Sequence, residues 1–258
     1  MVRRLSDNRT VPARFYTPVA ERLGDLVALP DDEAEHLTRV LRLKPGVLVR
    51  VFNGRGGEFE AVVENVSKAG VRVRLQARRE PSPEVRVAFT LAQAVLKGEK
   101  MDDVVRDAVM MGVSAIQPMV TTRSEVTLAS LRRSHRQDRW RRIAVSSAKQ
   151  CGRAVVPTVL EPCSFEEVVL SSVVTSESPQ LMFVEPSSSV DVIALGALDT
   201  TLPRACTLLV GPEGGWMPDE VGRGAASWRL VTMGARTLRA DAMAIVAVTA
   251  LLVHWRQL

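Results

Sequence analysis

The sequence of 258 residues is poor in cysteine, histidine and aromatic side chains. It contains three cysteines (Cys151, Cys163 and Cys206) and three histidines, with no Cys-x-x-Cys pair. The odd cysteine number argues against a disulfide framework, and the cysteines and histidines lack the spacing of a metal site. We therefore expect free thiols and no metal ion. Aromatic residues make up only 4% of the chain, so aliphatic side chains must fill the core.

Long apolar runs are also absent. The first ten residues, M-V-R-R-L-S-D-N-R-T, lack the apolar segment of a signal peptide. The longest apolar run, residues 242–253, is shorter than the roughly 20 residues that a membrane span needs. We expect a buried helix there, no membrane partner and a cytoplasmic location. The composition, 46% apolar and 24% charged, is typical of a globular protein.

Lysine is scarce, and the basic character of the chain is local. Only five of the 34 basic residues are lysine. Residues 132–153 carry eight basic residues and one acid, a net charge of +7, so the rest of the chain sums to −2 within a total of +5. Such a stripe is typical of a polyanion partner. A solvated helix face of an arginine-rich protein gives the same pattern, and composition alone does not decide between them.

The chain changes its pattern near residue 80. Strand-like runs separated by turn signals dominate residues 14–79, interrupted by one predicted helix over residues 31–42. This predicts a small barrel-like β domain over residues 1–80, followed by a Pro-Ser-Pro linker. From residue 84 onward strand-like and helical runs alternate, which is typical of a mostly parallel sheet with helices on both faces. We predict an α/β domain over residues 84–258.

Two glycine-containing loops follow strands of the predicted sheet. They are L-L-V-G-P-E-G-G-W (residues 208–216) and T-M-G-A-R-T-L-R-A (residues 232–240). Because ligands bind at the carboxyl ends of parallel strands, we expect these two loops to line one pocket at neighbouring strand ends. Pro212 removes a backbone N–H and Glu213 repels phosphate, which disfavours a dinucleotide or a triphosphate. A ligand with ribose hydroxyls, an amine or a positive charge, such as S-adenosylmethionine, is favoured. A tight turn without a ligand is the alternative.

These loops carry a resemblance to a known family. L-V-G-P-E-G-G-W, followed about 20 residues later by M-G-A-R-T-L-R-A-D-A-M-A, resembles the ribosomal RNA small subunit methyltransferase E family of the knotted SPOUT methyltransferases. H-L-T-R-V-L-R-L-K-P-G, L-K-G-E-K-M, T-T-R-S-E-V and R-W-R-R-I-A-V-S-S-A-K-Q-C-G-R occur in the family's order. The resemblance therefore covers nearly the whole chain.

The resemblance implies a fold and an activity. The fold is a PUA-like RNA-binding β-barrel in residues 1–80 and a methyltransferase domain in residues 84–258, with a parallel sheet and a deep trefoil knot. The activity is S-adenosylmethionine-dependent methylation of uracil N3 in 16S rRNA of the small ribosomal subunit, by a homodimeric enzyme. The implied cofactor contacts are Leu209, Gly211, Glu213, Gly214, Met233, Gly234, Leu238 and Arg239. The positions implied to face RNA or the active cleft are Arg14, Arg39, Arg42, Lys44, Lys97, Arg123, Gln150 and Arg153.

The proposed chemistry indicates three catalytic candidates. Loss of the N3 proton places negative charge on the flanking carbonyl oxygens of uracil, which a nearby arginine stabilises. We predict this role for Arg236 or Arg239, with Asp241 as an orienting group or a weak base. The alternatives are structural ion pairs for both arginines and a helix first-turn acid for Asp241.

Other functions stay open at this point. The family usually reads Leu-Arg-Thr-Glu-Thr-Ala where this chain reads L-R-A-D-A-M. That difference keeps two alternatives: a non-catalytic rRNA-binding relative, and a SPOUT methyltransferase that acts on a different RNA nucleotide. An oxidoreductase with a dinucleotide fold is a further alternative, against which the glycine spacing and Glu213 argue.

Overall fold

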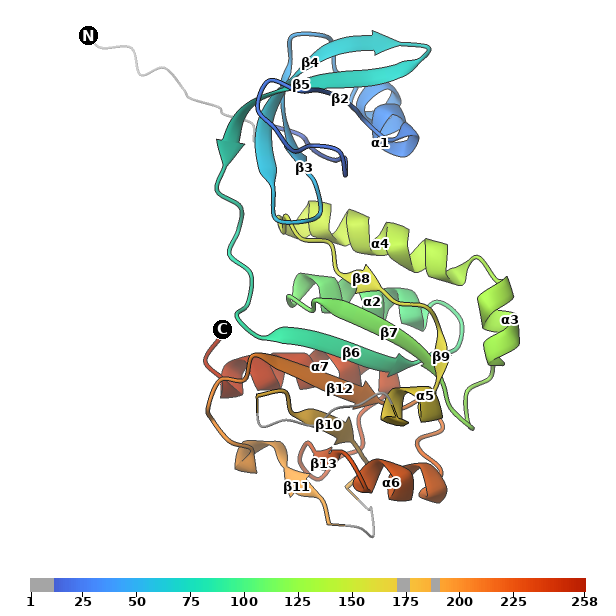
Figure 1. The fold of residues 1–258 in the computed structure, drawn as a ribbon. Coiled ribbons are helices and arrows are strands. Elements are labelled where there is room, and N and C mark those ends of the chain that lie inside the picture. Colours follow the sequence, from blue (N-terminus) through green and yellow to red (C-terminus); the bar gives the residue numbers. More distant parts are fainter. Residues whose placement is uncertain (1–11, 171–176, 187–190) are drawn as a thin grey trace, which may run out of the picture. The chain divides into compact units, whose positions relative to one another are not determined.

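The computed structural model describes residues 12–170, 177–186 and 191–258, and the chain forms two compact units (Figure 1). Unit 1 contains residues 12–82 together with Gly152–Val155. Unit 2 contains residues 83–151 and the described residues from Val156 to Leu258. Residues 1–11 of the first predicted domain lie outside the described residues. The predicted division at residues 80–84 stays a prediction, and the structure adds a short segment that returns to unit 1.

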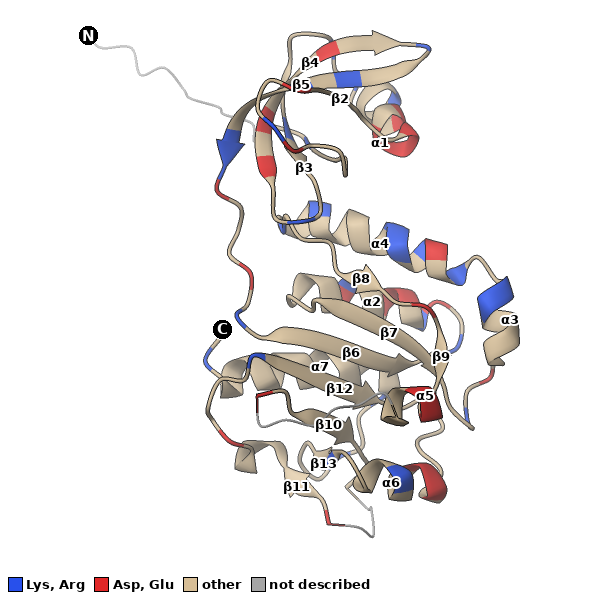
Figure 2. Ribbon diagram, viewed as in Figure 1, with Lys and Arg blue, Asp and Glu red and all other residues tan. Residues whose placement is uncertain are grey.

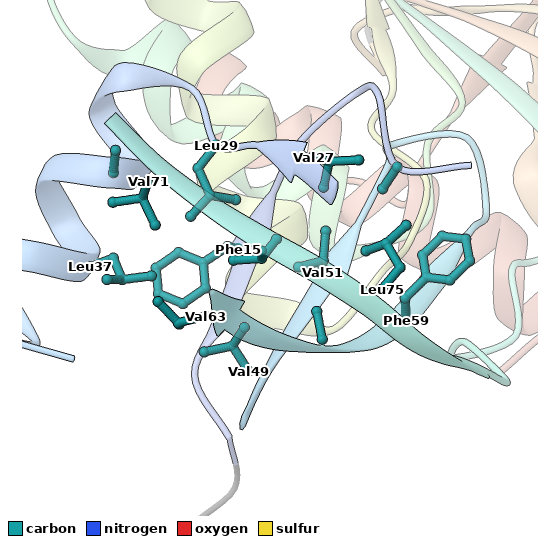
Figure 3. Close-up of a cluster of buried hydrophobic side chains, with 14 residues drawn as sticks. Phe15, Val27, Leu29, Leu37, Val49, Val51, Phe59, Val63, Val71 and Leu75 are labelled. Atoms are coloured by element: carbon teal, nitrogen blue, oxygen red, sulfur yellow. The ribbon is translucent and has the colours of Figure 1, made fainter. Parts of the chain in front are cut away.

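Unit 1 is built on a mixed five-stranded sheet in the order β1-β3-β4-β5-β2. Strands β1 and β3 pair in parallel, and the other neighbours are antiparallel. Residues alternate between core and solvent along β3 and β5, so that Val51, Val73 and Leu75 enter one apolar cluster with Phe15 and Phe59 (Figure 3). The strands are β1 (Arg14–Tyr16), β2 (Leu26–Ala28), β3 (Leu48–Phe52), β4 (Glu58–Ser67) and β5 (Gly70–Arg79). The β-rich pattern is confirmed, although β2 was not predicted.

The helix of unit 1 differs from its prediction. Instead of one helix over residues 31–42, α1 (Asp31–Glu35) continues as a wider π-helical turn, η1 (His36–Val40). The backbone N–H of Leu41 donates to the carbonyl of His36 at 3.0 Å, five residues back. Arg42 then ends the turn with a left-handed φ of 54°. Polar and apolar periodicity does not distinguish a single π turn from an α turn, so the sequence did not reveal it.

A segment of four residues, Gly152–Val155, belongs to unit 1 although it follows the helix Arg136–Cys151 of unit 2. The N–H of Gly56 donates to the carbonyl of Ala154 at 3.0 Å, and Val155 forms β-bridges with the turn at Gly54 and Arg55. In the run V-V-P-T-V (residues 155–159), the first residue belongs to this segment of unit 1. Only β8 (Thr158–Val159) joins the sheet of unit 2. The chain is thus interleaved between the two units.

Unit 2 is built on a sheet in the order β11-β13-β10-β12-β6-β7-β8, with β9 also paired to β7. All its described strand pairs are parallel, which confirms the predicted α/β class. Strand β12 is inserted between β6 and β10, and β10 separates β12 from β13. The strands are β6 (Ala88–Ala94), β7 (Ala115–Val120), β8 (Thr158–Val159), β9 (Cys163–Ser164), β10 (Gln180–Phe183), β11 (Ile193–Ala194), β12 (Ala205–Val210) and β13 (Arg229–Thr232).

Helices cover both faces of this sheet (Figure 1). On one face, Phe165 of α5 and Val221 of α6 pack with Met182, Leu209 and Leu230 of the strands. Helix α7 packs on β12 and against α2, which in turn contacts α4. The helices are α2 (Lys100–Met110), α3 (Leu128–Arg133), α4 (Arg136–Cys151), α5 (Phe165–Leu170), α6 (Pro218–Ala225) and α7 (Ala240–His254), with a 3-10 turn η2 (Leu195–Ala197).

Helix α7 contains the apolar run at residues 242–253, for which the sequence predicts a buried helix. Ala244, Ala247, Val248, Leu251 and Leu252 are all buried in the core of unit 2. In the described part of the chain, no helix has the length and apolarity to cross a membrane. Over the same residues, no group of three His, Cys, Asp or Glu side chains has the arrangement of a metal site.

Candidate cofactor pocket

A cavity of about 250 Å³ lies at the carboxyl ends of β10, β12 and β13. Its lining comes from residues 183–186, from 210–216 except Gly214, and from 232–243 except Gly234, Ala235 and Ala242, together with Lys100 of α2. Both glycine-containing loops therefore line one pocket, as the sequence predicts. The two loops do not follow neighbouring strands, however, because β10 lies between β12 and β13 and adds its own carboxyl end to the pocket.

The first loop approaches its neighbours closely at two glycines. A Cβ atom on Gly211 would lie 2.9 Å from the indole of Trp216, whose Nε1 donates to the carbonyl of Phe183 at 2.8 Å. Gly215 has a left-handed φ of 69°, and a Cβ there would lie 2.8 Å from the carboxylate of Glu185. Trp216 also packs on Phe165, with ring centroids 5.5 Å apart. These contacts fix the loop against the end of β10.

Glu213 is anchored to the start of α2. Its Oε1 accepts a hydrogen bond from Lys100 Nζ at 2.9 Å and another from the backbone N–H of Lys97 at 3.1 Å. Burial opposes ionisation of Glu213, but these hydrogen bonds and the Lys100 charge outweigh it, so its pKa lies below the usual value. The carboxylate therefore ties the glycine loop to α2, with one oxygen already engaged.

The second loop contains a paired arginine and an unpaired one. Arg239 donates from Nε and Nη2 to the two oxygens of Asp241, at 3.2 and 3.1 Å. Burial raises the pKa of Asp241, but Arg239 and nearby backbone N–H groups outweigh this and lower it overall. Arg236 also lines the cavity and has no ion-pair partner among the described residues. Of the two arginines, Arg236 is the one whose charge is not neutralised within the pocket.

Behind the glycine loop, a buried carboxylate joins two segments that are distant in sequence. Glu220 is 3% exposed. Its Oε1 accepts from the N–H and hydroxyl of Thr122, at 2.9 and 3.1 Å, and its Oε2 accepts from the N–H of Met217 at 2.9 Å. Arg123 adds a bond from Nη1 to the carbonyl of Gly214 at 2.6 Å. The loop after β7 (Ala115–Val120) thus clamps the glycine loop and the start of α6.

The residues predicted to contact the cofactor fall into two groups. Gly211, Glu213, Met233, Leu238 and Arg239 line the cavity. Leu209 is fully buried in the core of the sheet. Gly214 and Gly234 belong to the two loops but do not line the cavity. All three predicted catalytic residues, Arg236, Arg239 and Asp241, line the cavity.

Two of the residues predicted to face RNA are buried in unit 1. Arg14 lies 3.9 Å above the ring of Phe52, forms an ion pair with Glu58 at 3.1 Å and donates to the carbonyl of Arg153 at 2.8 Å. The side chain of Arg14 is 11% exposed, and Arg153 is 7% exposed. In this unit Arg14 therefore holds the returning segment, to which the buried Arg153 belongs, against the sheet.

The other predicted RNA contacts are exposed. In unit 1, Arg39 pairs with Glu35, while Arg42 and Lys44 follow on the exposed turn after η1. In unit 2, Lys97 Nζ donates to Glu125 at 2.8 Å, and Gln150 is exposed near the end of α4. Arg123, which lies in the loop after β7 and donates to the carbonyl of Gly214, is exposed as well.

The basic stripe lies on α3 and α4 (Figure 2). Part of its charge is neutralised within unit 2, since Arg139 pairs with Glu99 and Asp102, and Arg141 pairs with Glu161 at 3.0 Å. Arg133, Arg136 and Arg142 have no carboxylate partner among the described residues and keep their charge available. Both the functional interpretation and the solvated-face alternative therefore apply to part of the stripe.

The comparisons with known proteins agree with this architecture. A family model described as an RNA methyltransferase domain matches residues 83–252, and one described as an RNA methyltransferase PUA domain matches residues 29–76. The chain is 31% identical to the ribosomal RNA small subunit methyltransferase E of Synechocystis sp., over 86% of this chain and 71% of that one. The chain belongs to the ribosomal RNA small subunit methyltransferase E family.

Solved structures of the family share the fold. The ribosomal RNA small subunit methyltransferase E of Neisseria gonorrhoeae, bound to S-adenosyl methionine, is 29% identical with a TM-score of 0.83 and covers 95% of this chain and 98% of that one. A methyltransferase from Legionella pneumophila, solved with the bound cofactor SAM, is 28% identical with a TM-score of 0.85 and the same coverage. These matches confirm the predicted SPOUT-type methyltransferase fold with a PUA-like N-terminal domain. The trefoil knot stays a prediction.

Several pocket residues of this family member were not predicted from the sequence. Lys100 was missed, although it stands in the quoted L-K-G-E-K-M motif. Glu185 was missed because only the strand order shows that β10 ends at the pocket, and Thr232 was not singled out although it begins the second loop. Glu220 had a readable signal: proline at the first helical position followed two residues later by glutamate is typical of a helix start in which the glutamate caps the backbone.

Proposed function

We propose that this chain transfers a methyl group from S-adenosylmethionine to N3 of a uracil in 16S rRNA of the small ribosomal subunit. The observation that supports this most is the pocket at the three strand ends, in a chain whose relatives of 28% and 29% identity were solved with that cofactor. In this proposal residues 1–80 are the PUA-like RNA-binding domain and residues 84–258 the methyltransferase domain. The homodimer, the knot and the cytoplasmic location belong to the same proposal.

The pocket has features that suit a nucleoside cofactor. Thr232 lines the cavity, and its buried hydroxyl has no hydrogen-bond partner among the described residues. A buried polar group without a partner is costly, so a ligand that bonds to it is favoured. The close contacts at Gly211 and Gly215 leave no room for a side chain at either position, so Trp216 and Glu185 pack directly against the backbone of the first loop. The predicted contacts Gly211, Glu213, Met233, Leu238 and Arg239 are the ones we propose to hold the cofactor.

The cofactor supplies an electrophilic methyl group, and the residues of this chain prepare the uracil. N3 carries a proton, which passes to solvent water as the N3–methyl bond forms, and its loss places charge on O2 and O4 of the base. We assign Arg236 to that charge, because it has no ion-pair partner among the described residues. Asp241 engages both oxygens with Arg239 and has a lowered pKa, which makes it a positioning group for Arg239 rather than a base.

RNA binding is assigned to the exposed cations. Arg39, Arg42 and Lys44 of unit 1 and Lys97 and Arg123 of unit 2 remain our proposed contacts, with Gln150 as a neutral donor. Arg14 and Arg153 are proposed to act by holding the segment 152–155, since both are buried. Phosphate contacts give affinity and register, whereas the pocket selects the base. N3 lies on the pairing edge, so the uracil must be unpaired or flipped out of its helix.

The test is methyl transfer to small ribosomal subunits that lack the modification. The protein is incubated with S-adenosylmethionine, the rRNA is digested, and its nucleosides are identified by mass spectrometry. The expected product is 3-methyluridine, with turnover reduced about a hundredfold or more in Arg236→Ala, as for loss of one charge-stabilising group. A different methylated nucleoside would favour action on another nucleotide. RNA binding without methyl transfer would favour the non-catalytic alternative.

A further inference from the structure

Three acidic side chains line the pocket, and two of them are already engaged. Glu213 accepts from Lys100 Nζ and from the N–H of Lys97 on one oxygen, while Asp241 has both oxygens bonded to Arg239. Glu185 is exposed and has neither a hydrogen bond nor an ion pair with any described residue. It is therefore the pocket carboxylate with both oxygens available to a ligand.

The position of Glu185 directs its carboxylate to the glycine loop. It lies two residues after β10, which is the strand between β12 and β13, so it stands between the two loops of the pocket. Its Oε1 lies 2.8 Å from the point where a Cβ of Gly215 would be. A side chain at position 215 would therefore displace this carboxylate. The glycine keeps the acid against the inner side of the loop.

The charges of the pocket favour a neutral donor for this carboxylate. Lys100 and Arg239 are paired with acids, and Arg236 adds an unpaired positive charge. Counted with Glu185, the three cations of the lining balance its three acids, so an ammonium ion at Glu185 would leave the pocket with an excess positive charge, whereas a hydroxyl pair donates two hydrogen bonds and keeps the charges balanced. A carboxylate has two acceptor oxygens, which match the two hydroxyls of a ribose. An acid at the end of the strand beside a glycine loop is also how dinucleotide folds bind ribose.

We infer that Glu185 binds the ribose hydroxyls of the nucleoside part of the cofactor. This inference rests on the proposed function and adds to it a residue and a ligand group. Glu185 selects a ribonucleoside over a deoxynucleoside at this pocket. Glu213, by contrast, lines the pocket with one oxygen already engaged in holding the loop to α2.

The experiment is calorimetric binding of 5′-methylthioadenosine, which has the ribose but lacks the amino acid part, and of its 2′-deoxy form. The proteins are the unchanged chain and Glu185→Gln, with Asp219→Asn as a matched control. Asp219 is exposed in the first turn of α6 and does not line the pocket. Its substitution removes one negative charge, as Glu185→Gln does, without changing the pocket. Glu185→Gln should weaken 5′-methylthioadenosine about tenfold to a hundredfold, as for loss of a hydrogen bond to a charged acceptor.

Comparing 5′-methylthioadenosine with its 2′-deoxy form tests the same contact in the unchanged protein. Loss of the 2′-hydroxyl should weaken binding to the unchanged protein by a similar factor, and should add little further loss in Glu185→Gln. Equal binding of both nucleosides to the unchanged protein overturns the inference. So does a Glu185→Gln variant that loses S-adenosylmethionine but not 5′-methylthioadenosine, because the carboxylate then binds the amino group. If the unchanged protein binds S-adenosylmethionine but neither nucleoside, the inference fails and the proposed function stands; if it does not bind S-adenosylmethionine either, the proposed function fails.

Discussion

Replacing Glu220 with alanine tests whether a buried carboxylate holds the glycine loop in place. Glu220 is 3% exposed and accepts three hydrogen bonds, from the N–H and hydroxyl of Thr122 and from the N–H of Met217. The first two come from the loop after β7, and the third comes from the residue before α6. The substitution removes every bond that joins these two segments through this side chain.

The expected loss of stability follows from which donors can regain water. Thr122 is exposed, so its freed N–H and hydroxyl are rehydrated in part. Met217 is half-buried, and its N–H also loses the carboxylate that caps the start of α6. Hydrogen bonds to a charged acceptor contribute about 1.5–3 kcal/mol each, and partial rehydration reduces three such bonds to the equivalent of about two at the lower end. The free energy of unfolding of unit 2 should therefore fall by about 3 kcal/mol.

Urea unfolding followed by tryptophan fluorescence measures this change in unit 2 alone. All four tryptophans of the chain belong to unit 2; they are Trp140, Trp216, Trp228 and Trp255. With a slope of about 2 kcal/mol per molar urea, a loss of about 3 kcal/mol lowers the midpoint by about 1.5 M. Asp219→Asn, next to Glu220 but exposed, is the matched control and should change the free energy by less than about 1 kcal/mol.

The glutamine variant refines the test. Glu220→Gln keeps one acceptor oxygen for Thr122 and places an amide N–H against the N–H of Met217, so its midpoint should fall between those of the unchanged protein and Glu220→Ala. If Glu220→Ala unfolds at the same urea concentration as the unchanged protein, with the same slope, the clamp contributes no stability and the reasoning is refuted.

Three further predictions concern the same unit. Gly215→Ala should destabilise unit 2 by about 1 kcal/mol or more in urea unfolding, because φ is 69° there, whereas Gly222→Ala, in open space on α6, should stabilise it by about 0.5–1 kcal/mol; equal effects would contradict this. The pKa of Glu213 is lowered, so its carboxylate is ionised and accepts the bond from Lys100 at every pH above the usual pKa of 4.5; this bond is lost only as the pH falls through the lower pKa of the folded state. Protonation of Glu213 should therefore not weaken the stabilisation by S-adenosylmethionine between pH 8 and 5, as measured by thermal unfolding. Burial raises the pKa of Cys163 from 9.0 to about 11, so at pH 8 its alkylation rate should be about a hundredfold below that of an ordinary thiol, which mass spectrometry of labelled peptides measures; labelling as fast as in urea would contradict the burial.

Features that depend on neighbouring residues in sequence were predicted well. The alternation of strand-like and helical runs predicted the α/β class of unit 2. The apolar run at residues 242–253 lies in helix α7, which is buried on one side and exposes Val246 and Val253 on the other. Both loops of the pocket were placed at strand ends correctly. Short elements such as β2 (Leu26–Ala28), which has a single buried residue, carry too little periodicity to be recognised. The π turn after α1 likewise changes the hydrogen bonding without changing the pattern.

Features that depend on strand order could not be predicted. The sequence indicates that Leu208 to Val210 and Leu230 to Thr232 form strands, but not that β10 lies between them. This insertion is what brings the end of β10, with Glu185 and its neighbours, into the pocket. The pattern of apolar residues along the chain does not determine which strands become neighbours. The contribution of β10 to the pocket could therefore not be predicted from the sequence.

The same reasoning explains why the partners of charged residues were missed. The sequence places Glu213 in a ligand loop, but its partner Lys100 lies 113 residues earlier in the chain. Arg239 and Asp241 are two residues apart, and the pairing that was left open for them as an alternative is the one observed. A charged group in a binding loop can bind a ligand only with the hydrogen-bonding capacity that its own neighbours leave free. In this pocket that condition favours Arg236 and Glu185 over the residues with which they share the loops, and only the three-dimensional structure shows it.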